Sequence, residues 1–349
     1  MSSNYISRNA TLLQALAQLN QLPGRAMTLF VLDDGGRVVG TLTDGDIRRA
    51  LLGGCSLESQ VIDAACRHFK ALRGDESDVE QMRLCREMGI KLLPRLNPDG
   101  TIAEVIDLSI THSRLPLSAV LMAGGKGERL RPLTLTTPKP LLQIEGKAII
   151  DYNIEALAAV GIHDITVTTR YLAEQIAEHF ARPVAGVNVR CVVEDKPLGT
   201  IGSARLVGLP QQGETLVMNS DLLTTISFEE MYLRHRHSNA DITIAVIPYQ
   251  VSVPFAILTL DGEAVTGIAE KPSYSYYANA GIYIFANRLL NGLPEGKRVD
   301  ATDLIEEVIA AGGHVAYYPI KGTWIDVGSP TDFAQAAQLM KHHNNLNRN

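Results

Sequence analysis

From Leu117 onward, short apolar runs that predict strands alternate with longer patterns that predict helices. The predicted strands are Ser118–Met122, Ile165–Thr169, Val187–Val193 and Thr215–Met218, and the predicted helices are Ile149–Val160, Leu172–Phe180 and Ile201–Val207. Such alternation is typical of an α/β domain, in which helices cover a mostly parallel sheet. Ligands of such sheets bind beyond the carboxyl ends of the strands. We therefore expect a binding site in the segments that follow these strands.

The residues before Leu117 are organised differently, as a helix–strand–turn–strand order that is almost repeated. The first repeat predicts a helix at Thr11–Leu19, strands at Met27–Leu32 and Arg37–Leu42, and a helix that ends at Leu52; the second predicts a helix at Val79–Met88 and strands at Ile90–Leu96 and Thr101–Ile106. Residues Thr111–Pro116 are interpreted as a linker. At ~100–200 residues per domain, the 349 residues divide into a domain of residues 1–115 and one of residues 116–349.

The repeated order of the first domain resembles a tandem CBS (cystathionine-β-synthase) pair, a small α+β regulatory module. The resemblance depends on Thr43 and Asp46, which match the T-x-x-D pattern that contacts phosphate and ribose in that family. It implies a regulatory adenosine nucleotide here. The second repeat has Ala103–Asp107 at the equivalent place, without this pattern. The alternative for Thr43 is that it only caps the helix that follows.

The segment Ala123–Thr134 directly follows the first predicted strand of the second domain and contains Gly124, Gly125 and Gly127. Glycines let a backbone bend tightly and direct its N–H groups at a phosphate. Arg129 can donate two hydrogen bonds to phosphate oxygens, and Lys126 and Lys139 add positive charge. A Walker A loop is excluded because Glu128 follows Gly127, and a dinucleotide fingerprint is excluded because it needs a glycine at Leu130.

Two aspartates are candidate ligands of a divalent cation. Asp221 follows a predicted strand, and Asp326 lies in the segment Trp324–Pro330. Magnesium prefers a few carboxylates together with phosphate oxygens and water. A single aspartate at the end of a strand is more often a helix cap or a turn residue.

The segment Gly124–Pro140 meets every fixed position of G-G-x-G-x-R-L-x-P-L-T-x-x-x-P-K-P, and the chain from about Leu117 to about Met340 resembles the sugar-1-phosphate nucleotidyltransferases. This resemblance implies a Rossmann-like, mostly parallel sheet. It implies that the backbone of Ala123–Gly127 holds a triphosphate, that Arg129 holds the leaving pyrophosphate, and that Lys139 contacts the reacting phosphates. Asp221 and Asp326 match the N-x-D and W-x-D-x-G-[ST]-P motifs, in which each aspartate binds Mg²⁺.

The same resemblance implies a base pocket and a sugar pocket. The residues for the base are Glu194, Leu198, Gly199 and Thr200; those for the sugar are Glu270, Asn279 and Gly281, with Lys271 as a catalytic cation on the sugar phosphate. The chain departs from the family at Ser220, at Ile201, and at Pro254-Phe255-Ala256, where relatives have P-Y-G. Because of the last departure, the motif does not determine which sugar is bound.

The expected reaction transfers a nucleoside monophosphate from a triphosphate to a sugar 1-phosphate and releases pyrophosphate. The CBS-like repeats favour GTP with a mannose-like or amino-sugar 1-phosphate. Uridylyl or thymidylyl transfer to glucose 1-phosphate is an alternative, and so is a catalytically inactive nucleotide sensor of the same fold. A cytidylyltransferase for acidic sugars or polyols is disfavoured, since those relatives usually lack the R-L-x-P-L-T and P-K-P string.

Bulk properties limit the other possibilities. The formal net charge of −6 argues against general nucleic-acid binding, which needs a basic surface. The four cysteines form no C-x-x-C pair, so no zinc site is expected, and most of them are interpreted as buried apolar residues. Residues Met1–Ala10 lack the apolar core of a signal peptide, and no apolar run approaches the ~20 residues that span a bilayer. We therefore expect a cytoplasmic protein, and paired CBS repeats suggest a homo-oligomer.

Overall fold

The computed structural model describes residues 4–22, 26–73, 79–111 and 113–346. The chain forms two compact units, residues 1–114 and residues 115–349, and each has its own core. The predicted linker lies at this division, although His112 falls outside the described residues. None of the helices in the described ranges combines the length and the apolar character needed to cross a membrane.

The N-terminal unit contains two three-stranded sheets with the same strand order. The first sheet consists of β1 (Tyr5–Ser7), β2 (Thr28–Leu32) and β3 (Val38–Thr43), and the second of β4 (Leu72–Arg73), β5 (Leu92–Leu96) and β6 (Ile102–Asp107). In each sheet the first strand is parallel to the second, and the second is antiparallel to the third. Strands β1 and β4 were not predicted because two or three residues are too short to show alternation.

Helices cover these sheets and close the core of the first repeat. They are α1 (Leu12–Leu19), α2 (Asp44–Leu52), α3 (Val61–Ala64) and α4 (Val79–Glu87). Leu12 and Leu19 of α1 pack with Leu29, Leu42 and Ile47, all of which are buried. The helical stripe predicted from the sequence is therefore the face that meets the sheet.

The interpretation of the cysteines as mostly buried is wrong. Only Cys85 is buried, whereas Cys55 and Cys191 are half-buried and Cys66 is exposed. The backbone of Cys66 pairs with Thr41 in an isolated bridge, so its backbone is held while its side chain meets solvent.

The second unit is built on a seven-stranded sheet with the order β11-β10-β7-β12-β17-β14-β18. Its strands are β7 (Leu117–Ala123), β10 (Ile165–Thr169), β11 (Arg190–Val193), β12 (Glu214–Asn219), β14 (Ile242–Ser252), β17 (Ser273–Ala286) and β18 (Val315–Pro319). Only β17 runs against its neighbours, so the predicted mostly parallel α/β sheet is confirmed. The residues after β7, β10, β11 and β12 consequently meet at one edge of the sheet.

Helices pack around this sheet, and short 3-10 turns follow the glycine segment. The helices are α5 (Ile149–Ala159), α6 (Ala173–His179), α7 (Phe228–Ser238), α8 (Asn287–Asn291), α9 (Ala301–Ala310) and α10 (Pro330–Leu346); the 3-10 turns are η1 (Glu128–Leu130), η2 (Leu133–Leu135), η3 (Lys139–Leu141) and η4 (Gly202–Val207). The α-helix predicted at Ile201–Val207 is a 3-10 helix instead. The N–H groups of Ile201 and Gly202 both donate to the carbonyl of Val299, which ties this segment to a distant loop.

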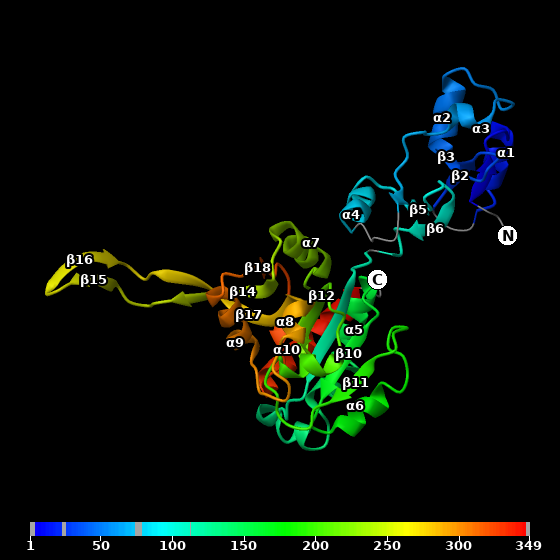
Figure 1. The fold of residues 1–349 in the computed structure, drawn as a ribbon. Helices are drawn as coiled ribbons and strands as arrows, with labels where there is room; N and C mark the ends of the chain where they lie inside the picture. Colours follow the sequence, from blue (N-terminus) through cyan, green and yellow to red (C-terminus); the bar gives the residue numbers. More distant parts are fainter. Residues whose placement is uncertain (1–3, 23–25, 74–78, 112, 347–349) are drawn as a thin grey trace. The chain divides into compact units, whose positions relative to one another are not determined.

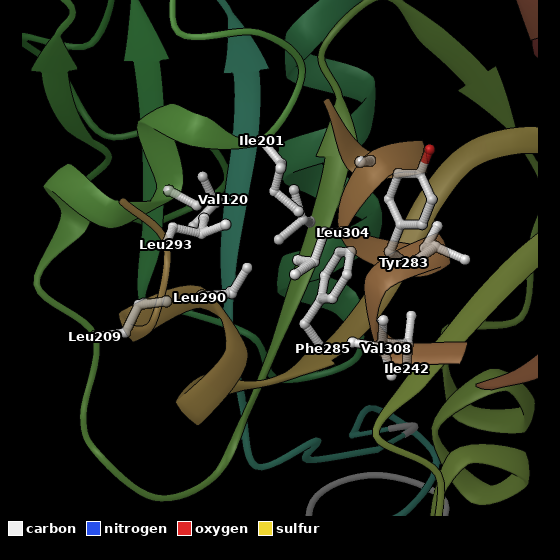
Figure 2. Packing of buried hydrophobic residues seen from close by; sticks show 14 of the residues in the cluster. Val120, Ile201, Leu209, Ile242, Tyr283, Phe285, Leu290, Leu293, Leu304 and Val308 are labelled. Carbon is white, nitrogen blue, oxygen red and sulfur yellow. The ribbon is translucent and has the colours of Figure 1, made fainter. Parts of the chain in front are cut away.

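A hydrophobic cluster joins the sheet to the helices on one face (Figure 2). Val120 of β7 and Phe285 of β17 meet Leu304 and Val308 of α9, and all four are buried. Ile201 packs into the same cluster. This packing fixes the strands whose carboxyl ends form the site described below.

Three two-stranded pairs complete the unit. They are β8 (Gln143–Ile144) with β9 (Lys147–Ala148), β13 (Leu222–Thr224) with β19 (Trp324–Asp326), and β15 (Ile257–Asp261) with β16 (Ala264–Ala269). The outer halves of β14 and β17 continue beyond the sheet and lead into β15 and β16, which forms the long ribbon on the left of Figure 1. We call Pro248–Tyr277 the arm. All its residues are exposed except Val253, Gly267 and Pro272, which are half-buried.

Candidate active site

A cavity of about 620 Å³ lies where the parallel strands end. The segments after β7, β10, β11 and β12 all contribute to its lining. The predicted site residues that line it are Ala123, Gly124, Gly125, Gly127, Arg129, Lys139, Glu194, Leu198, Gly199, Thr200 and Asp221. The structure thus brings the predicted phosphate segment, the predicted base segment and one predicted metal ligand to one cavity.

The glycine segment is shaped by close contacts with its own surroundings. Gly127 has a φ of 61°, and a Cβ atom there would lie 2.9 Å from Cγ2 of Thr134. The Thr134 hydroxyl also donates a hydrogen bond of 2.8 Å to the Gly127 carbonyl. A Cβ atom on Gly124 would lie 2.9 Å from Oε1 of Glu194, whereas one on Gly125 would meet nothing within 4 Å. The left-handed φ and the contact with Thr134 therefore require a glycine at position 127, whereas a side chain at position 124 would displace the Glu194 carboxyl group and Gly125 leaves open space in the cavity.

The pairing of β13 with β19 brings the two aspartates together. Leu222 lies opposite Asp326 in this pair, so Asp221 is next to Asp326 although the two are distant in sequence. The buried Asn153 of α5 donates a hydrogen bond of 2.9 Å to the Leu222 carbonyl and so holds β13 against this helix. This arrangement depends on residues from three separate segments.

Lys139 connects both aspartates. Its ammonium group donates to Oδ2 of Asp221 and lies 3.4 Å from Oδ1 of Asp326. The Lys139 side chain is buried, so the positive charge is held at one place in the cavity wall. Both aspartate carboxylates therefore contact the same ammonium group.

The same two carboxylates could hold a metal ion only together with a ligand. Within the described ranges, no group of three or more His, Cys, Asp or Glu side chains could hold a metal ion. A divalent cation at Asp221 and Asp326 would take its other oxygens from phosphate and water, which is how Mg²⁺ is commonly bound. The donor set fits magnesium bound with a triphosphate.

Arg129 links the glycine segment to the aspartate segment. A Cβ atom on Gly328 would lie 2.8 Å from Nη2 of Arg129, so the guanidinium group packs over this glycine two residues after Asp326. Gly328 and Arg129 both line the cavity. Two of the predicted cations, Arg129 and Lys139, are thus neighbours of the predicted metal ligands.

The segment Leu198–Thr200 and a loop distant in sequence, with Arg298 and Asp300, also line the cavity. Gly199 has a φ of 83°, and a Cβ atom there would collide with the carbonyl of Val299. The Thr200 N–H donates a hydrogen bond of 2.9 Å to Asp300, and the Thr200 hydroxyl accepts one of 2.8 Å from the Ala301 N–H. The pKa of Asp300 is lowered, mainly by the hydrogen bond from the Thr200 backbone.

Glu194 is a buried acid in the cavity wall, with 5% of its surface exposed. Burial raises the pKa of its carboxyl group, and hydrogen bonds from Ser203 and from the Leu198 N–H partly offset this rise. Arg170 also lowers this pKa through its charge. A carboxylate at this position offers acceptors to a bound ligand.

Several lining residues were not predicted. Arg170 directly follows the last residue of β10, so the strand-end rule could have identified it. The Nε atom of Arg170 is a buried donor without a hydrogen-bond partner among the described residues. Arg298 and Asp300 come from the loop before α9, and no motif in the sequence relates that loop to the glycine segment.

Some predicted residues lie elsewhere. Lys126 is exposed and does not line the cavity. Glu270 and Lys271 lie in the arm between β16 and β17, are exposed, and do not line the cavity either. The reason is that the arm extends past the sheet edge rather than folding over it (Figure 1).

Of the remaining sugar residues, Gly281 lies against a residue of the cavity lining, and Asn279 precedes it in the same strand. Gly281 has a φ of 71°, and a Cβ atom there would lie 2.5 Å from the side-chain amide nitrogen of Asn219, which lines the cavity. Asn279 accepts a hydrogen bond of 3.0 Å from the Gly281 N–H and donates one of 2.9 Å to the Tyr283 hydroxyl. Its side chain is therefore held by its own strand.

In the N-terminal unit, Thr43 and Asp46 contact each other as the alternative predicts. The Thr43 N–H and hydroxyl donate to Oδ2 of Asp46 at 2.8 and 2.6 Å, and the Asp46 N–H donates to the Thr43 hydroxyl at 3.3 Å. Thr43 is the N-cap of α2, and Asp46 also pairs with Arg49. These contacts form a complete capping box, and a ligand role for the pair stays a prediction.

Comparisons with known proteins agree with this geometry. Residues 2–53 match the CBS domain family. The chain is 30% identical over 228 residues to the mannose-1-phosphate guanylyltransferase of Mycobacterium tuberculosis, covering 63% of this chain and 64% of that protein. It is 31% identical over 230 residues to the mannose-1-phosphate guanyltransferase of Neurospora crassa, covering 62% of each. The matched stretches thus span less than two thirds of these curated relatives.

A solved structure shares the fold of the second unit. The crystal structure of HddC from Yersinia pseudotuberculosis superposes with a TM-score of 0.51 at 23% identity, covering 64% of this chain and 99% of that one. Residues 118–343, well over half of the chain and including the whole cavity described above, match the nucleotidyl transferase family. The chain belongs to the nucleotidyl transferase family, with a CBS domain at its N-terminus.

Proposed function

We propose that this protein transfers a nucleoside monophosphate from a nucleoside triphosphate to a sugar 1-phosphate, giving a nucleotide sugar and pyrophosphate. The observation that carries the proposal is the cavity that the glycine segment shares with Asp221 and with Lys139, whose ammonium group also contacts Asp326. Backbone donors, fixed cations and a pair of carboxylates are what a reaction between two phosphate groups needs.

The chemistry can be written with these groups in place. A phosphate oxygen of the sugar 1-phosphate attacks the α-phosphorus, the bond from that phosphorus to the bridging oxygen breaks, and pyrophosphate leaves with the electron pair. The nucleophile is ionised at neutral pH and needs no general base. Asp221 and Asp326 would hold Mg²⁺, which when bound neutralises charge on the phosphates. Lys139 and Arg129 supply positive charge beside the reacting groups.

We propose GTP as the triphosphate and a mannose-like sugar 1-phosphate as the acceptor. The relatives named above carry guanylyltransferase names, which supports this choice. Glu194 also supports it, because a carboxylate can accept from both the N1–H and the exocyclic amine of guanine. Uracil and thymine instead present one N–H between two carbonyl groups, which a carboxylate repels. Because the reaction uses soluble nucleoside triphosphates, the proposal includes a cytoplasmic location.

For the N-terminal unit we propose binding of a regulatory adenosine nucleotide. Its match to the CBS family supports this role, and Thr43 is the residue expected to contact the ligand. Calorimetry of the full-length protein with AMP, ADP and ATP, using Asp221→Asn to reduce binding in the catalytic cavity, tests it. Absence of binding by all three nucleotides would end this part of the proposal.

A substrate panel tests the catalytic proposal. Pyrophosphate release is measured for GTP, UTP, dTTP, CTP and ATP against mannose, glucose and glucosamine 1-phosphates, with magnesium. We expect the highest kcat/KM for GTP with mannose 1-phosphate. Release with no pair would indicate the inactive sensor, and preference for UTP or dTTP with glucose 1-phosphate would change the substrates but keep the reaction.

A further inference from the structure

The Glu194 carboxyl group is enclosed by residues from several segments of the chain. Glu194 is 5% exposed, and both Ser203 of η4 and Thr168 of β10 are fully buried. The hydroxyl oxygens of Ser203 and Thr168 lie 3.1 Å apart. Both hydroxyl groups and the Leu198 N–H form hydrogen bonds with the carboxyl group. A buried polar network of this kind fixes where the two carboxyl oxygens lie.

The register of the parallel strands places Arg170 beside this carboxyl group. Arg170 directly follows β10, Glu194 follows β11 on one side of it, and Gly124 follows β7 on the other. The Glu194 N–H donates a hydrogen bond of 2.8 Å to the Thr169 carbonyl, which holds two of these strand ends together. A Cβ atom on Gly124 would lie 2.9 Å from Oε1 of Glu194. The Glu194 side chain therefore extends across the end of β10, where Arg170 begins.

The guanidinium group of Arg170 is a permanent cation in this wall of the cavity. Arg170 is half-buried and lines the cavity, and its Nε atom is a buried donor without a hydrogen-bond partner among the described residues. Few buried donors in native proteins stay unpaired, and each one calls for an explanation. Arginine keeps its charge at any working pH. The fold thus places a fixed positive charge beside a buried acid.

The two groups act on each other through charge. Burial raises the pKa of Glu194, the hydrogen bonds described above lower it, and Arg170 is the charged group that lowers it most. Asp195 and Lys196, which follow Glu194 in sequence, are exposed. The other charged residues of the cavity lining are Glu128, Arg129, Lys139, Asp221, Arg298 and Asp300. A base bound against Glu194 excludes more water and favours the neutral acid further. The charge of Arg170 therefore matters most when the cavity is filled.

The charge state of Glu194 decides which base it can pair with. An ionised carboxylate accepts at both oxygens, whereas a protonated carboxyl group carries one donor. Guanine presents two adjacent donors, the N1–H and the exocyclic amine, so a protonated Glu194 would set one donor against another. Uracil presents an N–H beside a carbonyl group, which a protonated carboxyl group can pair with. An unpaired buried donor is costly, so loss of the charge on Glu194 would weaken the binding of GTP and not that of UTP.

We propose that Arg170 is a positioning residue that keeps Glu194 ionised while guanine fills the cavity, and thereby maintains a preference for GTP over UTP. The inference deepens the proposed function and rests on it, because it takes guanine as the base that Glu194 contacts. Arg170 acts through Glu194 and not on the phosphates. A contact with the phosphates would strengthen the binding of every triphosphate equally at every pH, so the two roles give different measurements.

The pH dependence of Arg170→Met tests this role. Its kcat/KM for GTP is measured between about pH 6 and pH 8 and divided by the wild-type value at each pH, which removes the ionisation of the substrates themselves. We expect this ratio to fall towards pH 6, by up to about tenfold per pH unit, because Glu194 becomes protonated in the variant. The same ratio for UTP should stay constant.

Two further variants identify the charge as the cause. Arg170→Lys keeps a positive charge and should restore most of the wild-type profile. Arg182→Met changes an exposed arginine outside the cavity lining and should match the wild type throughout. A ratio for Arg170→Met that is independent of pH, or an equal loss for GTP and UTP, would overturn the inference. A profile of Arg170→Lys that coincides with that of Arg170→Met would do the same.

Calorimetry separates this inference from the proposed function. The Kd values of GTP and UTP are measured for the same variants at the same pH values, with circular dichroism as the check of folding. If the wild type releases no pyrophosphate, the proposed transfer fails, yet a Kd for GTP that rises towards pH 6 only in Arg170→Met still supports the role of Arg170. A wild type that binds UTP more tightly than GTP would overturn that role, even if it releases pyrophosphate.

Discussion

Two glycines on one loop differ in what they do for the fold. Gly127 adopts a left-handed φ and sits against Thr134 and Lys139, whereas a methyl group on Gly125 would find no neighbour within 4 Å. A side chain is therefore incompatible with the fold at the first position and compatible at the second. What Gly125 provides is space for something outside the protein to approach the backbone.

We predict that Gly127→Ala lowers the free energy of unfolding of the second unit by about 1–3 kcal/mol, the cost of a strained φ together with a steric contact. Gly125→Ala is the matched control and should leave unfolding within about 0.5 kcal/mol of the wild type. Both should weaken triphosphate binding, because a methyl group on Gly125 occupies open space in the cavity and one on Gly127 displaces the loop and Lys139. Urea unfolding and nucleotide titrations separate the two effects. Equal unfolding of the two variants would contradict this account of the loop.

We predict that Lys139→Met lowers kcat/KM by about 10²–10³, a loss of roughly 3–4 kcal/mol in the transition state. The variant also leaves Asp221 and Asp326 facing each other without the ammonium that joins them. Lys147→Met is the control, since Lys147 forms an ion pair of 2.7 Å with Glu155 and does not line the cavity. Steady-state pyrophosphate assays of both variants give the comparison. Comparable turnover in the two would remove Lys139 from the mechanism.

At the scale of elements, the sequence predicted the part of the site that follows from strand direction alone. The ends of the parallel strands correctly indicated Ala123–Arg129 and Asp221 as neighbours, because strand direction alone determines this edge. The pairing of β13 with β19 could not be predicted, since each strand has only three residues. Arg298 and Asp300 were missed for a related reason, as about 100 residues separate this loop from Thr200, which Asp300 contacts in space.

The arm shows a different limit of sequence reasoning. The E-K-P motif indicates which residues resemble those of the family, but a motif carries no information about the direction in which its strand leaves the sheet. The structure extends β14 and β17 past the sheet edge, so Glu270 and Lys271 leave the cavity of their own chain.

Helix α7 contains a buried histidine that makes the stability of this element depend on pH. His235 is 2% exposed and lies 2.8 Å from the Thr243 hydroxyl of β14. Burial lowers its pKa below the usual 6.5, although Glu214 and Asp241 act in the other direction and Arg236 adds to the lowering. The unfolded chain therefore binds this proton more readily than the folded chain does.

We predict that this contribution to the free energy of unfolding is constant above about pH 7. It should fall as pH drops below about 6.5, by at most about 1.4 kcal/mol per pH unit. His235→Gln, which does not titrate, should remove this part of the slope between about pH 7 and pH 5.5. His237→Gln, at an exposed position of the same helix, should keep it. Urea unfolding at several pH values measures both, and identical slopes in the two variants would rule out His235 as the cause.

At the scale of the whole molecule, the chain has two units whose cores are built from separate residues. Leu42 belongs to the core of the N-terminal unit, and Phe285 to that of the second. Each hydrophobic cluster among the described residues lies within one of the two units. We therefore expect a ligand that binds one unit to stabilise that unit alone.

We predict that denaturant unfolding shows two transitions, and that ligands identify which unit each belongs to. Leu42→Ala, a buried truncation that typically costs about 2–5 kcal/mol, should shift only the transition of the N-terminal unit. GTP with magnesium at about 100 times its Kd should raise only the transition of the second unit, by about 2.7 kcal/mol. An adenosine nucleotide that binds near Thr43 should raise the free energy of unfolding only in the transition of the N-terminal unit. If the units unfold separately, a ligand stabilises only the unit that holds its site. A single transition that responds to both nucleotides would instead show that the two cores unfold together. In that case a nucleotide bound to one unit would also stabilise the other.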